Sequence, residues 1–168
     1  IFTANSPATR AAQRATKTIP IVMTNVSDPV GLGYVASLAR PGGNITGTVI
    51  QADELLRKLI QILHEVTPAA RRFAILSNAS NPSHAAYRAA AESACAALGL
   101  AAIWVVASAP AELAGAVELL VRQRSQAVVV VADPMYFNER VKLQTLMQIT
   151  GLPVAYGLRE HVVAGGLL

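Results

Sequence analysis

The 168-residue sequence is poor in cysteine, in aromatic residues and in charge. Its single cysteine, Cys95, excludes an internal disulfide and leaves the redox environment open. No apolar run reaches the roughly 18 residues that a membrane-spanning helix needs. Aromatic residues make up 5% and charged residues 14%, and the basic residues are not clustered with aromatic ones. A nucleic-acid partner is therefore not expected.

Hydrophobic residues make up 53% of the chain, which is enough for a well-packed core in one domain or two small lobes. Strands and helices alternate along the whole sequence. Strands are predicted at residues 1–3, 19–24, 44–50, 72–77, 101–106, 126–131 and 153–155. Helices are predicted at residues 7–16, 30–39, 53–66, 82–98, 110–124, 135–150 and 157–163. Because strands such as "AVVVVA" are continuously apolar, we expect an α/β fold with a mostly parallel sheet.

Four of the predicted strands end in a short polar turn that closes on proline: "TANSP", "TNVSDP", "SNASNP" and "VADP". Each proline fits the first position of a helix, where no N–H is needed. The residue before it is then the expected N-cap: Ser6, Asp28, Asn81 and Asp133. Capping alone explains these turns, but they also follow the carboxyl ends of parallel strands, where ligands bind in open α/β sheets.

A break near residue 48 divides the sequence into two parts. Residues 1–48 contain too few strands to bury their own helices and are predicted to be the C-terminal part of one lobe with a hinge crossover. Residues 49–168 form a regular succession of strands and helices and are predicted to be a second, nearly complete lobe. The chain has no initiator methionine or signal peptide, opens within a predicted strand and closes at the start of another, so we expect a fragment of a longer protein.

The segment Gly31-Leu32-Gly33-Tyr34-Val35-Ala36 fits the G-x-G-x-x-A pattern of a dinucleotide-binding loop, and an acidic residue, Asp53, follows at a suitable distance. The pattern requires the first glycine directly after the strand, but "NVSDPV" intervenes here. It also requires a long helix, but "PGG" ends the predicted helix near residue 40. The favoured interpretation is that Gly31 and Gly33 let a short helix pack closely against a neighbour.

No catalytic or metal-binding arrangement stands out. The three histidines, His64, His84 and His161, show no metal-ligand spacing, and Cys95 lies in an alanine-rich helix as a small core residue. There is no nucleophile elbow and no phosphate-binding P-loop. Tyr136 and Phe137 directly follow a predicted strand end, where they either pack against the helix start or form a stacking wall for a ligand.

The segment "ATKTIPIVMTNVSDPVGLGYVASLARPGGNITG" closely resembles ABC-transporter substrate-binding proteins, among them tryptophan- and tyrosine-binding members. "RRFAILSNASNPSH", "ADPMYFNER" and "GLPVAYGLREHVVAGGLL" agree with the same family, so the resemblance covers essentially the whole chain. It implies a type I periplasmic-binding-protein fold, with parallel sheets and flanking helices in two hinged lobes, of which the first is incomplete here. It places the glycines in the connection between lobes rather than in a pyrophosphate loop.

The resemblance also implies a function. The protein would be periplasmic or lipid-anchored outside the cytoplasm and would capture a small solute, an amino acid or a related carboxylate, for an inner-membrane ABC permease. It would need no cofactor and no metal, and it would not be an enzyme. The sheet edges left exposed in a fragment could also pair with a second copy.

Carried onto this sequence, the resemblance implies ligand contacts from both lobes. The implied residues are Asn5, Ser6, Ser27 and Asp28 in the first lobe and Asn78, Ser80, Asn81, Asp133, Tyr136, Tyr156 and Glu160 in the second. Asp28 or Asp133 would pair with the ammonium group of an amino acid. The backbone N–H groups near Asn81 and Ser83 would bind its carboxylate at a helix start.

Two other classes of function remain open at this point. An effector-sensing domain of a transcription regulator has the same fold and would need a DNA-binding segment elsewhere in the chain. An α/β enzyme would need a nucleophile and a base together at the ligand edge, and the sequence offers no such pair.

Overall fold

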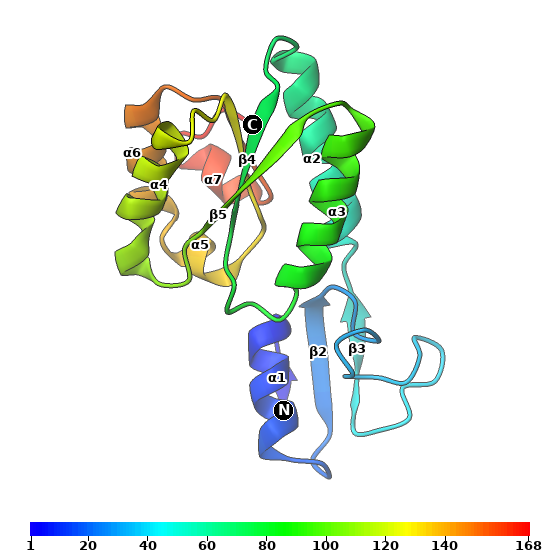
Figure 1. Cartoon of the computed structure of the whole chain (residues 1–168). Helices are drawn as coiled ribbons and strands as arrows, with labels where there is room; N and C mark the ends of the chain where they lie inside the picture. Colours follow the sequence, from blue (N-terminus) through cyan, green and yellow to red (C-terminus); the bar gives the residue numbers. More distant parts are fainter.

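A computed structural model describes all residues, 1–168, as two parallel sheets with helices packed on them (Figure 1). Sheet A has the order β1-β2-β3, formed by Phe2–Thr3, Ile21–Val26 and Ile45–Val49. Sheet B has the order β5-β4-β6-β7, and its strands in chain order are Arg72–Ser77, Ala101–Val106, Ala127–Val130 and Val154–Tyr156. All strand pairs are parallel. The predicted α/β fold with parallel sheets and flanking helices is therefore confirmed, and each predicted strand lies within two residues of its observed bounds.

The helices cover sheet B on both faces and sheet A on one. The helices are α1 (Ser6–Ala15), α2 (Ala52–Val66), α3 (His84–Ala97), α4 (Leu113–Arg122), α5 (Pro134–Asn138), α6 (Arg140–Thr150) and α7 (Arg159–Val163), and a short 3₁₀ turn, η1, occupies Pro110–Glu112. Helices α2 and α3 lie together on one side of sheet B, and α4 and α6 lie on the other (Figure 1). None of these helices is long and apolar enough to cross a membrane.

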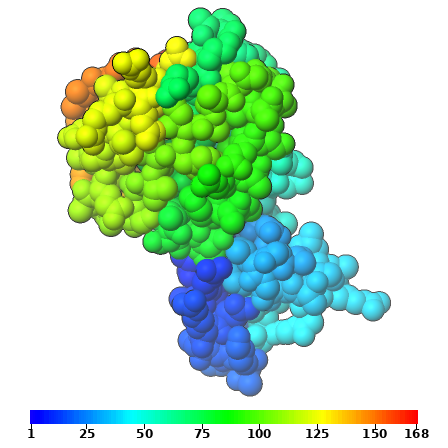
Figure 2. Space-filling view, in the orientation of Figure 1, coloured from blue at the N-terminus to red at the C-terminus, as the bar shows by residue number.

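Each sheet has its own hydrophobic core, and the two cores differ greatly in size. The core of sheet B contains 31 buried residues, including all of β6 and the inward side chains Ile60 and Leu63 of α2. The core of sheet A contains six, of which Ile21, Met23, Val26 and Ile45 come from β2 and β3. The sheet A half is correspondingly narrow in the space-filling view (Figure 2).

The two halves meet at a narrow waist. The only covalent link between the sheets is the short segment Ile50-Gln51, between the end of β3 and the start of α2. A second contact joins the start of α1 to the start of α3, where the hydroxyl oxygens of Ser6 and Ser83 are 3.0 Å apart in a buried hydrogen bond. The carboxyl ends of the strands of both sheets point toward this waist, so the residues that follow the strands gather there.

The prediction of a helix at residues 30–39 is wrong. This segment forms a series of turns and projects from the sheet A half (Figure 2). Asp28 has a left-handed backbone, with φ of 50°, and its Oδ1 accepts a hydrogen bond from the Gly31 N–H at 2.8 Å. Gly33 is also left-handed, with φ of 69°. These turns bring Tyr34 and Val35 into the small core.

Two helix starts and one continuous helix also differ from the prediction. Asn5 rather than Ser6 caps α1, through a hydrogen bond of 2.8 Å from the Ala8 N–H to Asn5 Oδ1, and α3 begins after Ser83 rather than at Pro82. The helix predicted at 135–150 is divided at Glu139 into α5 and α6. The guanidinium of Arg140 donates to the Phe137 carbonyl at the end of α5, at 3.1 Å.

Ile60 and Ile149 provide a matched test of the sheet B core. Ile60 in α2 is fully buried, whereas Ile149 in α6 is 81% exposed. We expect Ile60→Ala to lower the free energy of unfolding by about 2–5 kcal/mol, because it leaves a cavity in the core. The same substitution at Ile149 should change it by less than about 0.5 kcal/mol. Urea unfolding of the two variants measures both values, and equal effects would contradict the packing described here.

His161 predicts a dependence of stability on pH. It is 1% exposed, its ring stacks on Tyr156 with the centroids 4.9 Å apart, and its Nε2 lies 3.2 Å from the Tyr136 carbonyl. Burial lowers the pKa of His161 below its ordinary value, so the unfolded chain binds this proton more readily than the folded one. The stability that neutral His161 provides is therefore complete above the unfolded pKa of about 6.5 and is lost as the pH falls from that value through the lower folded pKa.

The measurement compares the protein with the His161→Phe variant in urea unfolding between about pH 8 and pH 5. The parent should lose more stability than the variant over this range, because phenylalanine has no proton to bind. Parallel pH profiles for the two proteins would show that His161 is not the group responsible.

Candidate ligand-binding site

A cavity of about 680 Å³ lies at the waist between the two sheets. Its volume is within the range of small-molecule binding sites. The segments that follow β1, β3, β4, β6 and β7, together with the end of β2, all contribute to its lining. The lining is thus built from the carboxyl ends of both sheets, the edge at which open α/β sheets bind ligands.

Asp133 provides a fixed negative charge on the sheet B wall of this cavity. It caps α5 and is 2% exposed. Its Oδ1 accepts hydrogen bonds from the Met135 N–H at 2.8 Å and from Asn78 Nδ2 at 3.2 Å, and its Oδ2 accepts one from Asn81 Nδ2 at 2.7 Å. All three donors are neutral, and no lysine or arginine lines the cavity. The carboxylate is held rigidly, but its charge is not neutralised by the protein.

The turn "SNASNPS" after β4 orients the two asparagines that hold Asp133. Asn78 Oδ1 accepts from the Ser80 N–H, and Asn81 Oδ1 accepts from the Ser83 N–H, both at 2.9 Å. Each amide therefore uses its oxygen for the local turn and its nitrogen for Asp133. The β4 and β6 strand ends are joined in this way, although Asn78 and Asp133 are 55 residues apart in the sequence.

Three backbone N–H groups around the start of α3 already have acceptors within the protein. The Asn81 N–H donates to the Asn78 carbonyl at 3.1 Å, the His84 N–H donates to the Asn81 carbonyl at 3.0 Å, and the Ser83 N–H donates to the Asn81 side chain. These three N–H groups are therefore not free to bind a ligand carboxylate. The expectation that N–H groups near Asn81 and Ser83 do so stays a prediction, and it would have to rest on other donors.

Apolar and aromatic side chains complete the cavity. Tyr87 of α3 lies at its inner wall, and burial raises the pKa of its hydroxyl above the ordinary value, so it stays neutral. Phe137 of α5 is half-buried and lines the cavity, with the Arg140 guanidinium 5.0 Å from its ring centre. Leu55 and Leu158 add aliphatic surface. The site therefore combines a buried carboxylate with an apolar, partly aromatic lining.

The structure brings five of the eleven residues implied by the sequence into the lining. These are Asn5, Ser6, Asn81, Asp133 and Glu160. Asn5 and Ser6 come from the sheet A half and the other three from the sheet B half. Glu160 is exposed at the start of α7, whereas Asp133 is buried.

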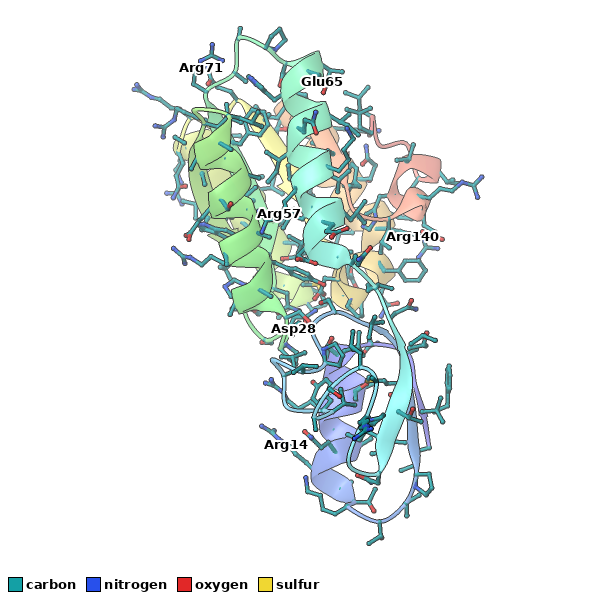
Figure 3. All side chains as sticks on the ribbon, turned by 90° about the vertical axis from the view of Figure 1, so that its right-hand side faces the viewer. Arg14, Asp28, Arg57, Glu65, Arg71 and Arg140 are labelled. Carbon is teal, nitrogen blue, oxygen red and sulfur yellow. The ribbon has the colours of Figure 1, made fainter.

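The other six do not line the cavity. Asn78 lies behind Asp133 and positions it. Ser80 is exposed in the turn after β4. Asp28 lies at the junction of the two halves (Figure 3), where its carboxylate bonds to Gly31. Ser27 is buried with a hydroxyl that has no hydrogen-bond partner.

The two tyrosines among the six are core residues. The Tyr136 hydroxyl donates to the Ala107 carbonyl at 2.9 Å and the side chain is fully buried, so the stacking wall at this position consists of Phe137 alone. The Tyr156 hydroxyl bonds to Gln144 Oε1 in the interior. Burial raises the pKa of both hydroxyls, because the ionised form would lose its hydration.

Sequence reasoning missed several lining residues, including Asn25, Gln51, Tyr87 and Leu158. Tyr87 lies within the alanine-rich helix and Gln51 in the connection after β3, and neither belongs to a recognisable turn. Asn25 belongs to the predicted polar turn after the strand at 19–24, but it was not among the residues chosen from that turn. Leu158 could have been found, since it follows a strand end as the predicted residues do.

The residues that could support catalysis or hold a metal are not gathered at the cavity. Its lining contains no histidine, cysteine, lysine or arginine. No group of three or more histidine, cysteine or acidic side chains is placed to bind a metal ion. Cys95 is buried in α3, and burial raises the pKa of its thiol to about 11, so the thiolate nucleophile is scarce at neutral pH.

Comparisons with known proteins agree with this architecture. A family model described as ABC transporter substrate binding protein matches residues 1–168. A tyrosine-binding protein of Clostridioides difficile (strain R20291) is 42% identical over 81 residues, which cover 48% of this chain and 23% of that protein.

Two solved structures show the same fold. An ABC domain from Streptococcus pneumoniae in complex with L-Trp has a TM-score of 0.90 and 22% identity, over 99% of this chain and 55% of that one. The ligand-free, open structure of a substrate-binding protein with adhesive properties from Clostridium difficile has a TM-score of 0.57 and 26% identity, over 93% of this chain and 52% of that one.

The chain spans about half the length of these structures, which cover nearly all of it. The family model covers it from the first residue to the last. The chain therefore belongs to the ABC transporter substrate-binding protein family.

Proposed function

We propose that this chain is part of an extracytoplasmic solute-binding protein that delivers an amino acid or a related carboxylate to an ABC importer. The observation that carries the proposal is the cavity between the sheets, with the buried Asp133 carboxylate held only by neutral donors. The two sheets would belong to two lobes, residues 1–48 and 49–168, that close around the solute. An inner-membrane permease would then accept the solute from the closed form.

An amino acid fits the chemistry of the cavity. Asp133 is buried without a cation, so an ammonium group placed beside it would gain a charge-assisted hydrogen bond. Phe137, Tyr87 and Leu55 offer an apolar surface for a side chain. The names of two relatives, a tyrosine-binding protein and a structure in complex with L-Trp, support an aromatic amino acid as the first candidate.

Binding without catalysis is the function that the site supports best. The cavity lining has no histidine, lysine or cysteine to act as a base or a nucleophile. Family membership favours transport over the effector-sensing domain of a transcription regulator. Self-association through the exposed sheet edges stays a prediction, which a monomeric mass in light scattering would contradict.

A thermal-shift panel of free amino acids tests the proposal on the full-length protein. Stabilisation should grow with ligand concentration and be largest for one class, with L-tyrosine and L-tryptophan as the first members to try. 4-Hydroxybenzoate is the matched comparison, because it is an aromatic carboxylate without an ammonium group. No shift with any amino acid would overturn the amino-acid assignment.

Asp133→Asn tests the role of the buried carboxylate. The variant keeps the shape of the side chain but removes the charge, so we expect affinity for the best amino acid to fall about tenfold to a hundredfold. Glu160→Gln, at the exposed edge of the cavity, should lower it by no more than about threefold, because water screens an exposed charge.

Isothermal titration below the melting temperature of each variant separates this effect from instability. The unliganded melting temperature is recorded for both variants, since Asp133 also caps α5. Equal affinities for the parent and Asp133→Asn would show that the ammonium group binds elsewhere.

A further inference from the structure

Asn25 occupies a β-bulge that turns its side chain away from the core of sheet A. Met23 pairs with Gly47 and Val26 pairs with Val49, so β2 advances three residues while β3 advances two. Met23 and Val26 are both buried in the small core. In a regular strand, Met23 and Asn25 would face the same side. The extra residue gives the inward position to Val26 and leaves Asn25 exposed at the cavity.

The backbone at Asn25 is left-handed, with φ of 52°. This conformation costs a residue other than glycine roughly 1–2 kcal/mol, although asparagine tolerates it better than most. Only two other non-glycine residues share it, Asp28 and Arg124. The Asp28 carboxylate bonds to the Gly31 N–H and so stabilises its own turn. The Asn25 amide makes no hydrogen bond to the protein, so local folding does not account for the choice of asparagine.

The cavity has a need that Asn25 can meet. Its charged lining residues are Asp133 and Glu160, both negative, and it contains no lysine or arginine. Among the lining residues, only neutral groups can donate a hydrogen bond to the carboxylate of an amino acid. The N–H groups of Asn81, Ser83 and His84 are occupied, and the amide nitrogen of Asn81 is bound to Asp133.

The polar groups on the sheet A wall are also partly occupied. The Asn5 oxygen caps α1, and the Ser6 hydroxyl bonds to Ser83. Asn25, which lies in strand β2 of sheet A, also lines the cavity, and neither its amide nitrogen nor its amide oxygen bonds to the protein. It extends from the half of the molecule opposite to the one that carries Asp133, so a single ligand can touch both.

We propose that Asn25 is a specificity-determining residue that donates its amide N–H to the carboxylate of the bound amino acid, while Asp133 on the opposite wall pairs with the ammonium group. The assignment rests on the proposed amino-acid binding. In this assignment, the bulge in β2 directs the amide of Asn25 into the cavity, whereas a regular strand would direct this side chain toward the core. It also explains how a cavity without basic residues can hold a zwitterion.

The Asn25→Asp variant tests the direction of this hydrogen bond. Aspartate tolerates the left-handed backbone and has nearly the same shape, but it offers a negative oxygen in place of the donor. We expect the affinity of the full-length protein for L-tyrosine, L-tryptophan or L-leucine, whichever binds best, to fall by at least about tenfold. The preference of the parent for the free amino acid over its carboxamide should decrease or reverse in the variant. Unchanged or tighter binding of the free amino acid would overturn the assignment.

Asn25→Gly, with Arg124→Gly as its control, separates binding from backbone strain. Both substitutions relieve a left-handed residue, at φ of 52° and 54°, but Arg124 lies outside the cavity lining. Both should keep or slightly raise the unliganded melting temperature. Only Asn25→Gly should weaken amino-acid binding in isothermal titration.

The outcomes of this experiment are distinguishable. If the parent binds and Asn25→Gly binds equally well, the role of Asn25 is overturned and the proposed function stands. If the parent binds none of the three amino acids, the role of Asn25 toward them is overturned, and the proposed function is then decided by the wider ligand panel.

Discussion

The buried carboxylate of Asp133 and the neutral groups that hold it are the interaction on which the candidate site depends. A buried charge is costly unless hydrogen bonds or an opposite charge compensate for it. Here three hydrogen bonds compensate in part, and they come from both the β4 turn and the start of α5. The same bonds fix the positions of two neighbouring strand ends. In the proposed function, a ligand cation would complete the compensation, so the group that joins these strand ends would also bind the ligand.

Much of the fold could be predicted because it depends on local patterns. Continuous apolar runs gave the strands, since a parallel strand is buried on both faces. The polar turns after β1, β4 and β6 located part of the cavity, because parallel strands end at one common edge. These turns contain Asn5, Asn81 and Asp133, which the family resemblance implied as contacts and which line the cavity. Tyr136 lies at the same edge of the sheet but is buried, because its position in the short helix α5 directs its side chain toward the core.

The features that sequence reasoning missed depend on contacts between distant segments. The bulge at Asn25 exists only in the pairing of β2 with β3, about twenty residues apart, which no single-strand pattern records. The turns at residues 30–39 form because Asp28 bonds to the Gly31 N–H and Tyr34 donates from its hydroxyl to the Ser6 carbonyl at 2.9 Å. The apolar residues of that segment suited a helix equally well. Its packing against α1 decided the outcome, and the sequence does not show that packing.

The unequal cores bear on how a solute could be held. The sheet A half has six buried core residues and meets the other half through one short link and the hydroxyl contact of Ser6 with Ser83. A hydrogen bond between neutral groups contributes only about 0.5–1.5 kcal/mol net. This single hydrogen bond therefore contributes little to holding the two halves together. Under the proposed function, a solute that touches residues from both sheets would add its own contacts and so stabilise the arrangement in which both walls face it.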